Sequence, residues 1–147
     1  MKKKFLISWA VIFVVWMAGS FAVHGVLLGE HYAQLPGLYR TESDTQELFY
    51  LMLIAHIIMA GAFVWIYQRG VEDRPWFAQG ARFGIAVAFL AVVPNYLIYY
   101  VVQPLPVDLV IGQVAGDSIL VLILGVIAAF LCRSGQPASQ TAADRRR

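Results

Sequence analysis

The sequence predicts an all-α membrane protein, a polytopic four-helix bundle built from two helical hairpins with both termini on the cytoplasmic side. Hydrophobic residues make up 60% of the 147 positions and charged residues only 14%, and the mean hydropathy is +0.68, which is outside the range of ordinary soluble domains. Charged residues gather at the ends and in two short stretches, leaving four apolar blocks. Each block is long enough to cross a hydrocarbon core of roughly 30 Å as a helix. The blocks are continuous, whereas the strands of a membrane barrel alternate polar and apolar residues.

The four apolar blocks define the expected helices of a transmembrane domain over residues 1–132. The predicted helices cover residues 5–28, 48–67, 83–102 and 107–131. The first follows Lys2–Lys4, as the core of a secretory signal peptide would. It is longer than the roughly 7 to 15 residues of such a core and contains Trp9 and Trp16, so we expect an uncleaved helix. Cleavage after the AGSFA segment is the alternative.

The longest predicted connection, residues 29–47, is acidic. Its carboxylates are Glu30, Glu42, Asp44 and Glu47. An apolar and aromatic set suited to the headgroup level predicts a short interfacial helix here: Tyr32, Leu35, Leu38 and Tyr39. Ser43 with Gln46, or Asp44 with Glu47, has the capping pattern that would start the second helix. We expect this loop to cover the outer face of the bundle.

The remaining connections contain clear helix boundaries. Gly70 ends the second helix, and Asp73–Trp76 has the pattern of a helix start with proline in the first turn. Pro104 and Pro106 cannot continue a helix, so the third and fourth helices should be antiparallel neighbours. The polar tail, residues 133–147, is predicted to be disordered.

The distribution of lysine and arginine predicts the orientation. Ten of the eleven basic residues belong to the N-terminus, the loop between the second and third helices, and the C-terminus. Arg40 alone lies on the other side. By the positive-inside rule, both termini are cytoplasmic, and the protein is expected in a bacterial cytoplasmic membrane. The net charge of +2 reflects this topology and does not indicate nucleic-acid binding.

Each predicted helix carries one strongly polar side chain in its outer half: His24, His56, Asn95 and Asp117. The helical rise places them roughly 6 to 15 Å below the outer surface. A carboxylate near a helix centre costs about 2.5 to 3.5 kcal/mol on insertion scales. We therefore expect Asp117 to have a partner, with His56 preferred, then His24, then Asn95. Gln113 lies one turn before Asp117 on the same face.

Two interpretations of this polar cluster stay open. In the first, the side chains serve only as interhelical hydrogen bonds; in the second, they form a ligand, proton or metal site. Haem between His24 and His56 and a metal bound by two histidines and Asp117 are both chemically acceptable. Neither has a local sequence motif, so we expect no cofactor.

The third and fourth helices contain two further patterns. Gly112 and Gly116 form a GxxxG pair, which predicts the close approach of another backbone. Pro94 is expected to kink the third helix beside Asn95. Three tyrosines are predicted to belong to an interfacial aromatic belt: Tyr96, Tyr99 and Tyr100.

Three stretches carry a resemblance to a known family. They are FAVHGVLLGEHYAQLPG (residues 21–37), LMLIAHIIMAGAFVWIYQRG (51–70) and VVPNYLIYYVVQPL (92–105). In their order and topology they resemble an uncharacterised family of small four-helix bacterial membrane proteins, known only as a domain of unknown function. The resemblance covers about residues 5–131. It implies a fold and a topology, and no activity.

No sequence motif indicates an enzyme. Serine-hydrolase, zinc-protease, phosphate-loop and dinucleotide motifs are absent, and the single Cys132 excludes a thiol-redox enzyme with paired cysteines. The leading hypothesis is a non-enzymatic small membrane subunit or binding protein in the lipid bilayer, joined to a second copy or a larger membrane complex through faces such as Gly112 and Gly116. The alternative is a small transporter or proton-linked carrier that uses Asp117 and His56.

Overall fold

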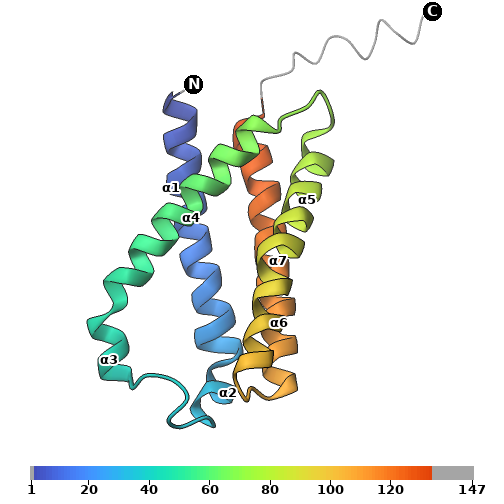
Figure 1. Ribbon diagram of the computed structural model, residues 1–147. Helices are drawn as coiled ribbons and strands as arrows, with labels where there is room; N and C mark the ends of the chain where they lie inside the picture. Colours follow the sequence, from blue (N-terminus) through green and yellow to red (C-terminus); the bar gives the residue numbers. More distant parts are fainter. Residues whose placement is uncertain (1, 134–147) are drawn as a thin grey trace, which may run out of the picture.

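The computed structural model describes residues 2–133, and over that range every regular element is a helix. Four helical spans are long and apolar enough to cross a membrane, which confirms the predicted all-α class (Figure 1). The spans are α1 (Lys2–Ser20) continued by the π-helical segment η1 (Phe21–Leu27); α4 (Phe49–Arg69); α5 (Trp76–Val87) continued by the π-helical segment η2 (Ala88–Val92) and α6 (Val93–Val102); and α7 (Val107–Cys132). The predicted disordered tail lies, from residue 134 on, outside the described residues.

The third span begins earlier than its predicted start at residue 83. Helix α5 begins at Trp76, directly after Pro75. Gln79 and Arg82 lower the hydropathy of the first turns, which is why the apolar block begins only after them. Arg82 is exposed, so this end of the helix can remain in water while Gly80 and Gly84 pack on α7.

The connection between the first and second spans contains two short helices, α2 (Gly29–Ala33) and α3 (Glu42–Glu47). The N-cap of α3 is Thr41, whose Oγ1 accepts a hydrogen bond from the backbone N–H of Asp44 at 3.3 Å. The predicted capping residues, Ser43 and Asp44, lie instead in the first turn of α3. The capping pattern was predicted to start the second span, but it starts the short helix α3, which ends before α4 begins.

The two ends of the bundle differ in charge. At one end, here called the basic end, α1 and α5 begin and α4 and α7 end (Figure 1). Its basic side chains are Lys3, Lys4, Arg69, Arg74, Arg82 and Arg133. The opposite end, here called the loop end, holds α2, α3 and the turn between α6 and α7. Its acidic side chains are Glu30, Glu42, Asp44, Glu47 and Asp108.

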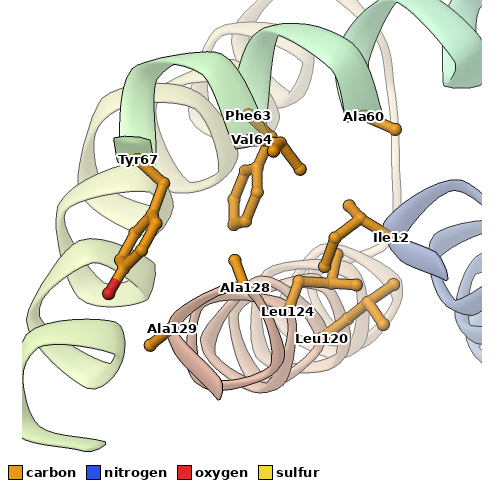
Figure 2. Close-up of a cluster of buried hydrophobic side chains, with 9 residues drawn as sticks. All are labelled: Ile12, Ala60, Phe63, Val64, Tyr67, Leu120, Leu124, Ala128 and Ala129. Carbon is orange, nitrogen blue, oxygen red and sulfur yellow. The ribbon is translucent and has the colours of Figure 1, made fainter. Parts of the chain in front are cut away.

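The largest buried cluster lies where α1, α4 and α7 meet (Figure 2). Its members are Ile12, Ala60, Phe63, Val64, Tyr67, Leu120, Leu124, Ala128 and Ala129. The Phe63 ring packs edge-on against Trp16 of α1 and Phe83 of α5, with centroid distances of 5.4 and 4.7 Å. In hydrocarbon, such contacts hold helices together by van der Waals packing rather than by removal of surface from water. The cluster and its aromatic neighbours therefore connect all four spans.

Helices α5 and α7 make backbone contact through three glycines. A Cβ atom at Gly80 would lie 2.6 Å from the carbonyl oxygen of Gly125, and one at Gly84 would lie 2.6 Å from the Cα atom of Leu122. No residue with a side chain fits at such distances without movement of a backbone. Gly80 and Gly84 are one turn apart and form a second GxxxG pair, which the sequence analysis did not single out.

The GxxxG pair that the sequence analysis singled out packs against the first span of the same chain. A Cβ atom at Gly112 would lie 2.6 Å from a methyl carbon of Leu28, and one at Gly116 would lie 2.6 Å from a methyl carbon of Val23. Leu28 and Val23 are themselves buried. Because they cover this glycine face, a contact between two copies of the chain would need a different surface.

Helix α4 leans away from the other spans towards the loop end (Figure 1). Near its middle it contacts α1, where the indole N–H of Trp9 donates to the carbonyl oxygen of Ile57 at 2.8 Å and the Trp9 ring lies against Gly61. The first turns of α4 have no such cover. Their exposed apolar side chains are Phe49, Tyr50, Leu51, Met52, Ile54 and Ile58. The first four are consecutive and therefore face all sides of the helix.

Candidate functional site

A continuous chain of hydrogen bonds links the first, third and fourth spans with α2 at the loop end. The phenol of Tyr96 donates to Oδ2 of Asp117 at 2.5 Å, and Nε2 of His24 lies 3.2 Å from the same oxygen. On the other side of the imidazole, Nδ1 of His24 lies 2.7 Å from the Tyr32 hydroxyl, to which Nε2 of Gln113 donates at 3.0 Å. We call these five residues the polar chain.

The π-helical segment η1 positions the histidine of the polar chain. His24 lies at the centre of η1, where the wider turn of the first span faces α6 and α7. Single π-helical turns inside α-helices are frequent at functional sites. The side chains of His24 and Asp117 are 32% and 18% exposed, so the pair is partly open to its surroundings, whereas Gln113 is only 5% exposed.

Donor and acceptor chemistry gives the polar chain a direction. With neutral His24, one arrangement satisfies all four contacts: Gln113 donates to Tyr32, Tyr32 donates to Nδ1 of His24, and Nε2–H of His24 donates to Asp117, which also accepts from Tyr96. The Oε1 atom of Gln113 is buried and has no hydrogen-bond partner among the described residues. A rotation of the Gln113 amide would bring this oxygen to Tyr32.

A second pair fastens α2 to the start of α7. Nε2 of His31 lies 3.4 Å from Oδ2 of Asp108, with both side chains largely exposed. Together with the bond between Tyr32 and Gln113, it holds α2 over the end of α7. The loop end is therefore closed by α2 and not by α3.

The expected pairing of Asp117 with His56 is wrong in this structure. Nδ1 of His56 lies 2.8 Å from the carbonyl oxygen of Met52, and Nε2 lies 3.3 Å from the Ser20 hydroxyl. The residue is 9% exposed, and its ring packs edge-on against Trp16 at a centroid distance of 6.5 Å. His56 serves the contact between α1 and α4. It is excluded from the polar chain because α4 leans away from α6 and α7.

The third span contributes Tyr96 rather than Asn95. Asn95 is exposed and makes no side-chain hydrogen bond within the described residues, whereas the adjacent Tyr96 is half-buried and bonded to Asp117. The sequence analysis had assigned Tyr96 to an interfacial belt. The π-helical segment η2 partly explains why Tyr96, and not Asn95, faces Asp117, because its extra residue shifts the helical register just before Pro94 and Asn95. The signal available in the sequence was the need of Asp117 for donors, which a tyrosine can supply.

Burial raises the pKa of the Tyr32 phenol above its ordinary value, an effect that the hydrogen bond from Gln113 only partly offsets. Tyr32 therefore stays protonated at neutral pH and can act as the donor to His24. A raised phenol pKa contributes stability that is present below the unfolded-state value of about 10 and is lost as the pH rises through the folded-state value.

This shift predicts an alkaline limit to stability. We expect the free energy of unfolding to fall as the pH rises above about 10, and Tyr32→Phe to make that decline shallower. Unfolding in detergent across the alkaline range, followed by tryptophan fluorescence, measures the slope. An equal slope in parent and variant would contradict the assignment, whatever the difference in absolute stability.

Among the described residues no group of three or more histidines, cysteines or carboxylates lies close enough to hold a metal ion. Both ring nitrogens of His24 and of His56 have hydrogen-bond partners within the chain. Comparison of the chain with family models, with curated proteins and with solved structures gives no significant match. The resemblance to the uncharacterised bacterial family stays a prediction.

Proposed function

We propose that this chain is a non-enzymatic small membrane subunit or binding protein of a bacterial cytoplasmic membrane, with both termini in the cytoplasm. The observation that carries the proposal is the first turn of α4, where four consecutive apolar side chains, Phe49 to Met52, are exposed. Helices associate in membranes through close side-chain packing. A helix whose first turn is not held by its own bundle offers such packing to the helix of another protein.

The polar chain supports this proposal by holding together the part of the loop end from which α4 leans away. It connects η1, α2, α6 and α7 through four side-chain hydrogen bonds. A partner helix docking beside α4 would therefore meet a preorganised neighbour, which lowers the entropic cost of association. The contact would extend from the exposed part of α4 towards the partly open pair of His24 and Asp117.

Co-purification from native membranes tests this function. We expect the chain, extracted in polymer-bounded native nanodiscs, to carry a partner protein at a fixed ratio. Ile58→Trp on α4 should lower the partner's yield about fivefold, the effect of roughly 1 kcal/mol. Ile119→Trp on α7 is the matched control, since Ile119 is 59% exposed and Ile58 63%. A chain that purifies alone, or a partner that both variants release equally, would contradict the proposal.

A proton-linked carrier is a second candidate, favoured by the contact of Asp117 with His24. A carboxylate bonded to an imidazole can exchange a proton between two stable arrangements. The geometry replaces His56, named from the sequence, with His24 as the partner. Proteoliposomes containing a pH-sensitive dye provide the test. A carrier should dissipate an imposed proton gradient, Asp117→Asn should slow this at least about tenfold, the effect of roughly 1.4 kcal/mol, and His56→Gln should leave it unchanged. Parent liposomes that hold the gradient as well as empty ones would eliminate the carrier.

A further inference from the structure

Two adjoining hollows lie at the basic end, far from the polar chain. The larger, of about 910 Å³, lies between the loop that joins α4 to α5 and the end of α7. The smaller, of about 280 Å³, lies between the end of α4 and the beginning of α5. Both are lined by Tyr67, Glu72, Arg74 and Gln79. These shared residues make the two hollows one depression with a narrow arm between α4 and α5.

The arm between α4 and α5 is lined by both basic and apolar side chains. The basic side chains, Arg74 and Arg82, are here called the rim, and the apolar ones include Phe83 and the exposed Ile66. Nε of Arg74 is 2.7 Å from a carboxylate oxygen of Glu72, which neutralises it. Arg82 has no carboxylate partner among the described residues. The rim therefore carries one uncompensated positive charge, placed directly above apolar side chains.

The two helices that form the arm separate as they run away from the basic end (Figure 1). The aromatic contacts of Phe83 with Tyr67 and Phe63, at centroid distances of 5.3 and 4.7 Å, fill the space between them nearest the core. Towards the outside, Ile66 and Ile85 are exposed. Ile66 and Phe83, which line the smaller hollow, and the exposed Ile85 thus offer apolar surface to hydrocarbon chains.

We propose that this arm is a binding site for an anionic phospholipid, with its phosphate on Arg82 and its acyl chains in the gap between α4 and α5. Basic pockets between transmembrane helices on the cytoplasmic side are suited to such headgroups. The charge of the rim matches the phosphate, and the apolar interior matches the chains of the same molecule. A soluble phosphate compound would match only the rim. This inference goes beyond the proposed function, on which it rests only for placing the site in the cytoplasmic leaflet.

Native mass spectrometry with added phosphatidylglycerol tests the proposal. We expect the parent to retain phosphatidylglycerol in preference to phosphatidylcholine, and Arg82→Gln to weaken phosphatidylglycerol binding about fivefold, the effect expected for one basic side chain near a headgroup. Arg69→Gln is the matched control, because Arg69 lies at the same end but stacks on Trp65 at 4.7 Å and does not line either hollow. It should bind the lipid as the parent does.

Three results would overturn the lipid site. Equal weakening in Arg82→Gln and Arg69→Gln would mean that only the diffuse charge of the basic end attracts the lipid. Equal retention of phosphatidylcholine would remove the role of the headgroup. Displacement of the lipid by glycerol phosphate at similar concentrations would assign the rim to a soluble anion. None of these outcomes depends on a partner protein, so the co-purification experiment can succeed or fail independently.

Discussion

Gly84→Ala is expected to destabilise the protein by about 1 to 3 kcal/mol, the range for overpacking a close contact, whereas Gly112→Ala should cost clearly less. The added Cβ atom at Gly84 would meet the backbone of α7, at 2.6 Å from the Cα atom of Leu122 and 2.8 Å from the carbonyl oxygen of Val121. The added Cβ atom at Gly112 would meet the methyl end of Leu28, which can rotate away. Both variants gain the same helix propensity.

Reversible unfolding in mixed detergent micelles measures this difference between the two glycine variants. The control for the effect of alanine itself is Gly29→Ala, because nothing lies within 4 Å of a Cβ atom there. If Gly84→Ala proved no more destabilising than Gly112→Ala, the close contact between α5 and α7 would be refuted.

Asp117→Asn and His24→Gln are each expected to destabilise the protein by about 1 to 2 kcal/mol, because each leaves hydrogen-bonding groups of the polar chain without their partner. The double variant should cost less than the sum, with a coupling of about 1 kcal/mol. The atoms concerned, Nε2 of His24 and Oδ2 of Asp117, are 3.2 Å apart. Their coupling is the energetic signature of the pair.

The same cycle run with His56→Gln is the control. His56 shares no hydrogen-bond partner with Asp117, so the two changes should add to within about 0.3 to 0.5 kcal/mol. Coupling of Asp117 to His56 in place of His24 would restore the pairing expected from the sequence and exclude the observed one.

The helices were predictable from the sequence because their cause is local. A run of apolar residues long enough to cross a bilayer must satisfy its own backbone hydrogen bonds, and a helix does so without help from the rest of the chain. The third span shows the limit of this argument. Its first turns contain Gln79 and Arg82, and a helix that reaches into the headgroup region no longer has to be apolar.

The partners of each side chain were not predictable, because they depend on how the helices lean and turn. Depth along the helices made His56 and His24 nearly equal candidates as the partner of Asp117. The tilt of α4 is what separates His56 from Asp117. Tyr96 and Asn95 differ by one position, and the π-helical segment η2 alters which of them faces α7. GxxxG pairs occur three times in the sequence, at residues 25/29, 80/84 and 112/116, and the spacing does not tell which pair meets a backbone.

The glycine contact between α5 and α7 also divides the molecule mechanically. Two helices joined backbone to backbone have little room to slide, and the polar chain adds η1 and α2 to this pair at the loop end. Helix α4 is attached to the other described spans by side-chain contacts around Phe63, by the indole of Trp9 and by the contact of His56 with Ser20, near its middle and its end. In mechanical terms, α5, α7 and the elements joined to them form a stiff unit, and α4 is its one compliant helix. A partner or a lipid would act on the rest of the chain through α4.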